Sequence, residues 1–295
     1  MAHNIFKGLG IALITPFLED GSVDYKSLIR LVEYQLNNGA DFFCILATTG
    51  ETPTLTAEEK QKIKDLIVDL VGGRVPILVG CGGNNTAAIV NELQTGDFRG
   101  VDGILSVCPY YNKPSQEGLY QHFKAIAAAT QLPVVLYNVP GRTGVNMTAA
   151  TSLRLAYDCP NIVAIKEASG NLEQVDEIIK NSPRGFEVLS GDDALTFPMV
   201  SCGAVGAISV IGNALPREFS KMIRLQMRGE YDGARKIHHR FQDLFSLLFV
   251  DGNPAGVKCM LSEMGYIQNI LRLPLVPTRI STLQRMSEIM KELKI

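Results

Sequence analysis

The chain has 295 residues, of which 46% are hydrophobic and 20% are charged, and its formal net charge is −2. This length allows one large domain or two ordinary ones. A near-neutral chain offers no long-range field to a polyanion, which excludes nucleic acid as an expected partner. Its six widely spaced cysteines form no paired metal or redox motif and are typical of a cytoplasmic protein. No apolar run is long enough to cross a membrane, so we expect a soluble protein.

Short apolar, β-branched runs alternate along the chain with longer segments of helical periodicity. We expect eight strands, about 20 to 33 residues apart, which is the length of one βα unit. They begin near Leu9, Phe42, Val75, Gly103, Pro133, Ile162, Phe186 and Gly206. Strands joined by helices run parallel, and eight units favour an α/β fold of the closed (β/α)8 type, a TIM barrel, over an open doubly wound sheet.

Capping residues predict where several helices begin. Thr56 and Glu59 can form a capping box that opens a helix ending at Gly72. Asp24 and Ser115 are further N-cap candidates.

The strand pattern stops after about residue 215. Residues 216–229, 231–248, 254–264 and 281–294 have helical periodicity instead. This tail is longer than closing a barrel requires. We therefore predict a catalytic barrel over residues 1–225 and a C-terminal helical appendage over residues 226–295.

Lys166 is the one lysine inside a predicted strand, and active sites of parallel barrels lie at the C-terminal strand ends. Strand alternation places it on the inner face with Ile162 and Ala164. Val163 and Ile165 then face the helices. Burial disfavours an ammonium, and a neutral amine can attack a carbonyl to form a Schiff base. Position alone leaves two other roles open, which are binding a phosphate or other substrate group and forming an ion pair at the rim.

Hydroxyl groups lie at two other strand ends. Tyr137 could relay protons to an intermediate on Lys166, or it could cap the barrel with its hydroxyl in water. Thr48 and Thr49 precede Gly50, where backbone amides can approach a small carboxylate. Threonine is common where strands end, so this pair is a weak signal on its own.

Arg142 lies in a loop stiffened by Pro140 and bracketed by glycines. Its guanidinium could hold a carboxylate through two hydrogen bonds, or it could be an exposed, solvated arginine. The glycine-rich run at residues 80–85 lacks the last glycine of a dinucleotide fingerprint. His238 and His239 are adjacent and have no third ligand at metal spacing. We expect no nucleotide cofactor and no metal.

Five segments match one family in order along the chain: Thr48-Thr49-Gly50-Glu51, residues 109–120, Tyr137-Asn138-Val139-Pro140-Gly141-Arg142-Thr143-Gly144, Ile165-Lys166-Glu167-Ala168 and Ser190-Gly191-Asp192-Asp193. In these motifs the chain resembles the dihydrodipicolinate synthases, which are pyruvate-dependent class I aldolases related to N-acetylneuraminate lyase. The resemblance runs from about Gly8 to Pro274, essentially the whole chain.

The resemblance implies that pyruvate condenses with Lys166, without any cofactor, and that Tyr137, Thr48 and Tyr111 form a proton relay. Thr48 and Thr49 would hold the pyruvate carboxylate. In this family the tyrosine that matches Tyr111 enters the site of the neighbouring subunit. A dimer would then be the smallest complete catalyst, and a dimer of dimers is the expected homo-oligomer.

The resemblance also implies the second substrate. The enamine would attack L-aspartate 4-semialdehyde, whose carboxylate Arg142 would bind, and would give 4-hydroxy-tetrahydrodipicolinate for diaminopimelate and lysine synthesis. Gly191 and Ile208 would line the pocket through their backbones. Sialic acid lyases lack this arginine, so Arg142 favours the synthase over N-acetylneuraminate or 2-keto-3-deoxy sugar acid lyase. A third hypothesis is a barrel that binds pyruvate without turnover, but such a protein needs no proton relay.

The chain departs from the family pattern in two places. Ala47 stands where glycine is usual, and alanine would be strained there if the backbone required a positive φ. Ala57, Lys60 and Ala88 fall where members with a lysine feedback site carry polar or acidic side chains. An ammonium ligand would lose a partner at Ala88 and meet like charge at Lys60. We expect weak or absent feedback inhibition by lysine.

Overall fold

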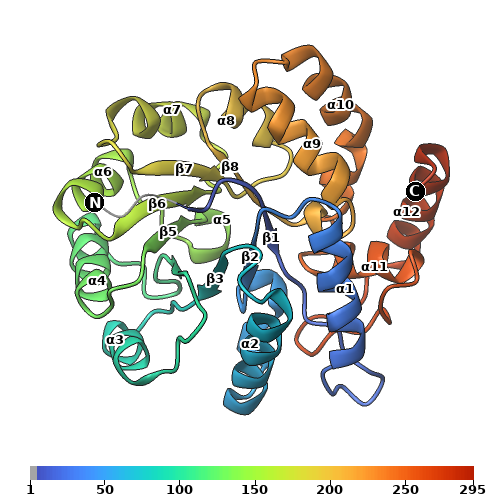
Figure 1. Ribbon diagram of the computed structural model, residues 1–295, viewed down its shortest axis with the longest axis horizontal. Coiled ribbons are helices and arrows are strands. Elements are labelled where there is room, and N and C mark those ends of the chain that lie inside the picture. Colours follow the sequence, from blue (N-terminus) through green and yellow to red (C-terminus); the bar gives the residue numbers. More distant parts are fainter. Residues whose placement is uncertain (1–4) are drawn as a thin grey trace.

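A computed structural model describes residues 5–295, and its strands close into one barrel. Each strand pairs in parallel with the next, and β1 also pairs with β8 (Figure 1). The strands are β1 (Gly8–Ala12), β2 (Phe42–Ile45), β3 (Ile77–Gly80), β4 (Gly103–Val107), β5 (Val134–Asn138), β6 (Ile162–Glu167), β7 (Glu187–Ser190) and β8 (Gly206–Ser209). The predicted (β/α)8 barrel is confirmed. β3 and β5 begin slightly later than predicted, each after a proline that lacks an N–H group for the ladder.

Helices follow every strand and cover the outside of the barrel (Figure 1). They are α1 (Tyr25–Asn37), α2 (Ala57–Val71), α3 (Thr86–Thr95), α4 (Gln116–Ala128), α5 (Pro140–Thr143), α6 (Ala149–Asp158), α7 (Leu172–Asn181), α8 (Thr196–Ser201) and α9 (Pro216–Met227). The predicted capping box at Thr56 and Glu59 is present. Asp24 and Ser115 also cap their helices as predicted. Short 3₁₀ turns lie at Thr48–Gly50 (η1), Thr52–Thr54 (η2) and Ile211–Asn213 (η3).

The barrel separates two apolar cores. Inward side chains such as Phe42, Leu78 and Leu189 fill its interior. A larger core lies between the strands and the surrounding helices. Both faces of each strand are therefore buried, as a parallel sheet requires.

The start of β6 departs from simple alternation. Ile165 packs in the outer core and Ala164 in the inner one, as predicted. The prediction was wrong for Ile162 and Val163, because Ile162 packs in the outer core and Val163 in the inner one. The register of β5 and β6 shifts between Ile162 and Ala164, and such an irregularity exchanges the faces of the residues before it. Lys166 lies beyond the shift and keeps its inward position.

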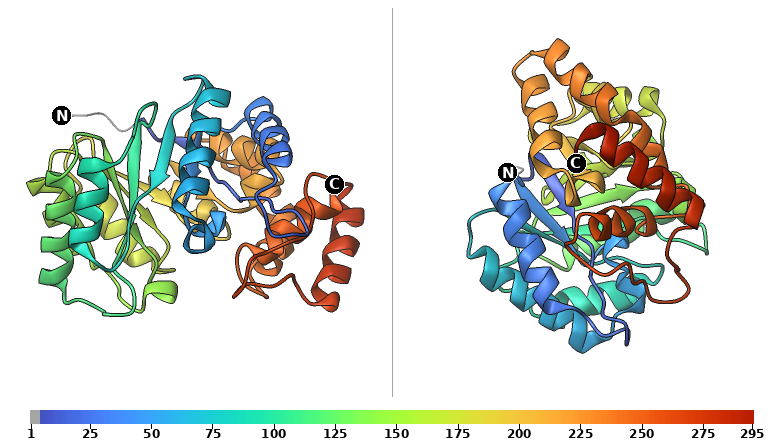
Figure 2. Two further views of the ribbon diagram at one scale, coloured as in Figure 1. Left: turned by 90° about the horizontal axis from the view of Figure 1, so that it is seen from below. Right: turned by 90° about the vertical axis from the view of Figure 1, so that its right-hand side faces the viewer.

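The last three helices, α10 (Tyr231–Leu247), α11 (Ala255–Glu263) and α12 (Ile280–Leu293), extend beyond the barrel. They occur where helical periodicity predicted them. α10 packs on α9, and α11 and α12 lie together at one side of the barrel (Figures 1 and 2). α9 packs against β1 and runs across residue 225. The division of the chain at that residue stays a prediction.

Within residues 5–295, no helix combines the length and the apolar character that crossing a membrane requires.

Candidate active site

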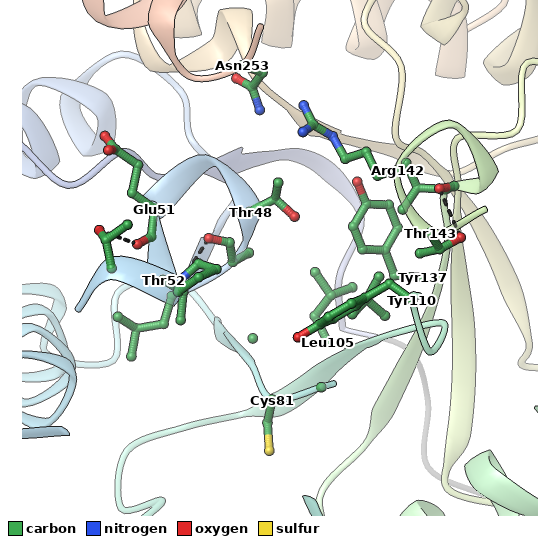
Figure 3. A pocket seen from close by; sticks show the side chains of 18 of the residues that line it. Thr48, Glu51, Thr52, Cys81, Leu105, Tyr110, Tyr137, Arg142, Thr143 and Asn253 are labelled. Carbon is green, nitrogen blue, oxygen red and sulfur yellow. Dashed lines mark hydrogen bonds between the residues drawn. The ribbon is translucent and has the colours of Figure 1, made fainter. Parts of the chain in front are cut away.

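A cavity of about 470 Å³ opens at the C-terminal ends of β2 to β5. Thr48 lines it after β2 and Tyr137 at the end of β5. Arg142 reaches it from the loop after β5, and Asn253 reaches it from the C-terminal region. Figure 3 shows these four side chains around one space, with the Tyr137 hydroxyl directed into it. The position agrees with the strand end at which parallel barrels place their active sites.

Lys166 and Tyr137 are neighbours on β6 and β5. The Lys166 Nζ lies 4.1 Å from the centre of the Tyr137 ring. Each residue is only 5% exposed. The barrel thus brings together a buried amine and a phenol that faces the cavity. This is the pair of groups that Schiff-base chemistry with proton transfer requires.

The alternative in which Lys166 forms a rim ion pair with Glu167 does not fit the geometry. The buried Glu167 carboxylate accepts hydrogen bonds from Asn138 Nδ2, Gln174 Nε2 and the Ser169 amide, at 2.8 to 3.2 Å. These contacts lie outside the barrel wall, because β6 alternates between its two faces.

The small residue Gly191 accommodates the Lys166 side chain. A Cβ at Gly191 would lie 3.0 Å from both Cγ and Cε of Lys166 and 2.9 Å from the Ala168 Cβ. Gly191 therefore leaves the space that the lysine occupies.

Cys44 lies in the barrel interior, where burial raises the pKa of its thiol to about 11 although the charge of Lys166 acts in the opposite direction. At neutral pH this thiol is protonated, so it is a weaker nucleophile than a thiolate.

The threonine pair lies on the tight turn η1. Thr49 is buried, and Thr48 lines the cavity. Leu46 and Glu51, on either side of the pair, have positive φ values of 52° and 53°. Strained backbone of this kind concentrates at functional sites. Ala47 has an extended backbone with φ −108°, so alanine is unstrained at the position where the family usually has glycine.

The Arg142 loop is anchored at its base. Arg142 itself is exposed on the short helix α5 and lines the cavity. Asn138 at the end of β5 accepts the Met147 amide at 3.0 Å and donates to Asn146 Oδ1 at 2.7 Å. Gly144 ends α5 with φ 74°, a conformation that favours glycine. A hydrogen-bonded base therefore supports an exposed guanidinium at the cavity mouth.

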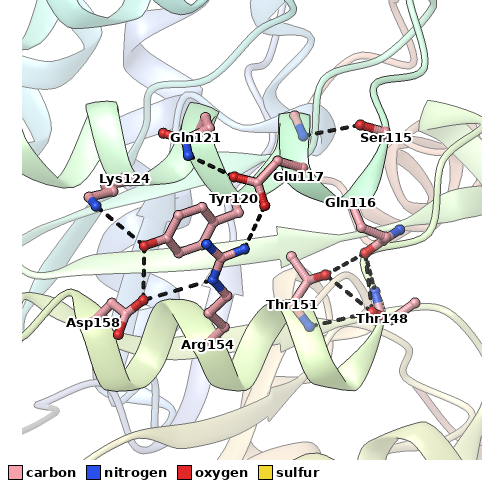
Figure 4. Close-up of polar contacts among 11 residues, drawn as sticks. Ser115, Gln116, Glu117, Tyr120, Gln121, Lys124, Thr148, Thr151, Arg154 and Asp158 are labelled. Carbon is pink, nitrogen blue, oxygen red and sulfur yellow. Dashed lines mark hydrogen bonds and ion pairs between the residues drawn. The ribbon is translucent and has the colours of Figure 1, made fainter.

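Contacts between α4 and α6 hold the far end of this loop (Figure 4). Gln116 Nε2 donates to the Asn146 carbonyl at 2.8 Å, and its Oε1 accepts the Thr148 amide and the Thr151 hydroxyl. Beside them, the Arg154 guanidinium lies 3.4 Å from the centre of the Tyr120 ring. The Gln116 contacts therefore tie the segment after Arg142 to α4 and α6.

Two of the predicted substrate-binding residues lie at β7 and β8. Gly191 follows β7 and abuts Lys166. Ile208 lies on β8 in the barrel interior and is 1% exposed. Asp193 joins the two strand ends by accepting the Val210 and Ile211 amides at 3.0 and 2.7 Å. Burial raises the pKa of Asp193 to about 6.

Tyr111 is the one predicted catalytic residue that the chain directs away from its own cavity. It is 89% exposed, with a left-handed φ of 74°. Tyr110 lines the cavity instead. Asn84 donates to the Tyr110 carbonyl at 3.1 Å and accepts from Asn112 at 3.0 Å, and these two bonds hold the tip of the loop.

Two polar residues that support the site, Asn253 and Lys258, were not predicted from the sequence. Asn253 Nδ2 donates to the Thr49 hydroxyl at 2.9 Å. Lys258 forms a buried ion pair with Glu51. A lone lysine in the otherwise apolar segment 255–261 was the available signal. Among the described residues, no three His, Cys, Asp or Glu side chains gather closely enough to hold a metal ion.

A parallel barrel with a buried lysine and a tyrosine at its catalytic end defines the class of Schiff-base aldolases. The chain belongs to the dihydrodipicolinate synthetase family, whose model matches residues 5–293. The 4-hydroxy-tetrahydrodipicolinate synthase of Phocaeicola vulgatus is 66% identical over 295 residues, which cover 100% of this chain and 99% of the relative. That of Parabacteroides distasonis is 63% identical with the same coverage.

Solved structures agree with this assignment. Dihydrodipicolinate synthase from Thermotoga maritima superposes with a TM-score of 0.96 at 40% identity and covers 99% of both chains. The enzyme from Acinetobacter baumannii, solved with pyruvate, has a TM-score of 0.95 at 39% identity, over 99% of this chain and 100% of that chain. The chain is therefore an enzyme, a lyase of the class I aldolase type that acts in lysine biosynthesis.

Proposed function

We propose that the chain condenses pyruvate with L-aspartate 4-semialdehyde to give 4-hydroxy-tetrahydrodipicolinate, through a Schiff base on Lys166 and without a cofactor. The observation that carries this proposal is the buried Lys166 amine, 4.1 Å from the centre of the Tyr137 ring at the catalytic end of the barrel. The names of the relatives supply the reaction. The six free cysteines suit a cytoplasmic location, where thiols stay reduced.

The proposed bond changes begin at the Lys166 amine. Lys166 adds to the keto carbon of pyruvate, and loss of water leaves an imine. Removal of a methyl proton gives the enamine, which attacks the aldehyde carbon of the second substrate. The amino group of that substrate then attacks the imine carbon, which closes the ring and releases Lys166. Every proton in this sequence must move at a site within hydrogen-bond reach.

Tyr137 and Thr48 line the cavity and are proposed as members of the proton relay. Tyr111 is proposed as the third member, supplied by a second copy of the chain. Its 89% exposure supports that role, because the side chain is free to reach a neighbouring chain. A dimer is then the smallest complete catalyst, and we propose a dimer of dimers.

Thr48 and Thr49 are proposed to hold the pyruvate carboxylate at the turn η1. The Thr49 hydroxyl already accepts a hydrogen bond from Asn253, so its own proton is available to a carboxylate oxygen. Gly191 and Ile208 are proposed to line the pyruvate end of the site through their backbones. The contact of Gly191 with Lys166 supports this placement.

Arg142→Ala is expected to raise the KM for L-aspartate 4-semialdehyde about 30-fold, because a charged hydrogen-bonded pair contributes about 2 kcal/mol. Arg142 lines the cavity mouth and is exposed enough to meet a carboxylate. Steady-state kinetics with each substrate varied in turn provide the measurement. Arg235→Ala, which removes an exposed arginine on α10, is the matched control and should leave both KM values unchanged. Equal loss of pyruvate adduct formation in Arg142→Ala would contradict the assignment.

L-Lysine at up to about 1 mM is expected to leave the rate unchanged, because like charge repels an ammonium ligand. Lys60 lines the cavity, and Ala57 and Ala88 are exposed on α2 and α3. A dihydrodipicolinate synthase structure from Cyanidioschyzon merolae contains bound lysine, so that protein is a suitable positive control. Half-inhibition of this chain at sub-millimolar lysine would refute the expectation.

A further inference from the structure

The C-terminal region contacts the back of the η1 turn that carries Thr48 and Thr49. Asn253, just before α11, donates to the Thr49 hydroxyl. Lys258, within the first turns of α11, pairs with Glu51 at the end of the same turn. Figure 3 shows Glu51 at the left of the cavity and Asn253 above it, on the C-terminal segment. These residues are distant in sequence, so the fold creates the contact.

The Glu51–Lys258 ion pair is completely enclosed. Both side chains have zero exposure. Lys258 Nζ also donates to the Ile270 carbonyl at 3.0 Å and lies 4.1 Å from the centre of the Phe17 ring. The second carboxylate oxygen of Glu51 accepts the Arg272 amide at 3.1 Å. Each charged atom therefore has partners fixed by the C-terminal region.

A buried ion pair is a poor device for stability alone, because desolvation offsets much of the Coulomb attraction. Burial lowers the pKa of Lys258 to about 8, while the nearby Glu51 carboxylate opposes that shift. The pair does, however, fix the position of the Glu51 side chain relative to α11. Glu51 has the strained φ of 53° that joins η1 to η2, and such a conformation persists only when its surroundings enforce it.

The strained conformation has a direct consequence for the threonines. The Glu51 amide donates to the Thr48 carbonyl at 3.1 Å, which closes the turn. A displaced Glu51 would therefore shift Thr48 and Thr49 relative to Lys166. Asn253 fixes the rotation of the Thr49 hydroxyl from the same C-terminal segment. Small errors in such placement have large effects on binding and rate.

We infer that Lys258 is a positioning residue for pyruvate, which acts through Glu51 to hold the Thr48–Thr49 turn in its binding conformation. This inference rests on the proposed role of the two threonines. It also gives the C-terminal helices a function, since they add contacts to the η1 turn beyond those that the barrel supplies.

Lys258→Met tests this inference in the full-length enzyme. We expect the KM for pyruvate to rise about tenfold while kcat changes less than about twofold, because binding geometry is lost and the nucleophile remains. Lys64→Met is the matched control. Lys64 is also a buried lysine, 5% exposed in its side chain, but it pairs with Asp65 and Asp97 away from the cavity. The Lys64→Met variant should lose stability without a change in its KM for pyruvate.

A double variant, Glu51→Gln with Lys258→Met, separates positioning from folding. It leaves no unpaired buried charge, so it should fold even if the single variant does not. We expect its KM for pyruvate to stay raised. A KM equal to that of the Lys64→Met control, in either Lys258 variant, would overturn the inference. Trapping of pyruvate on wild-type Lys166 would still stand in that case, so the two proposals fail separately.

Discussion

Lys166→Ala is expected to abolish turnover, with a loss in kcat/KM of at least about 10⁴-fold, because it removes the nucleophile and with it the covalent route. No other described lysine lies beside Tyr137 in the barrel interior. Neither the neutral Cys44 thiol nor a water molecule replaces the amine. The measurement is the steady-state rate with saturating pyruvate and L-aspartate 4-semialdehyde.

The variant should keep its fold, because the substitution removes a buried ionisable group and leaves the apolar interior in place. Circular dichroism and thermal unfolding provide that control. A variant that folds normally and keeps more than about 1% of the wild-type rate would contradict a role for Lys166 as the nucleophile.

Gly191→Ala is expected to lower kcat about 100-fold, because a displacement of about 1 Å at a reacting group has an effect of that size. The new methyl group would meet Lys166 Cγ and Cε at 3.0 Å, which is too close for the lysine to keep its position. Gly191 does not have the positive φ that favours glycine, so backbone strain is not the cause. The measurement is kcat together with the rate of imine formation with pyruvate alone.

Gly233→Ala is the matched control for this substitution. Gly233 lies in α10, where a new methyl group would meet only the flexible end of Leu225 at 3.3 Å. Its activity should equal that of the wild type. If Gly191→Ala forms the imine as fast as Gly233→Ala does, the contact with Lys166 does not set the position of the amine.

The sequence predicted the barrel because each strand and helix is a local pattern. The capping box at Thr56 and the helices after residue 215 are read from neighbouring residues alone. The wrong prediction of the faces of Ile162 and Val163 shows what local patterns cannot predict. The register shift depends on how β6 pairs with β5, and alternation within one strand contains no information about that pairing.

The candidate site also contains residues that local patterns predict and residues that only the fold brings together. Lys166 and Tyr137 could be predicted because each closes a strand, and strand ends meet at one face of a barrel. Their 4.1 Å approach is visible only in the fold. Asn253 and Lys258 could not be placed from sequence, because they reach Thr49 and Glu51 across about 200 residues of chain. Long-range polar contacts of this kind follow from packing and have no local pattern.

Reduction with borohydride in the presence of pyruvate is the most direct measurement of the Schiff-base mechanism. Intact-mass analysis should show one pyruvate-derived adduct per chain, and peptide mapping should place it on Lys166. The absence of an adduct, or its location on another lysine such as the buried Lys258, would contradict the mechanism.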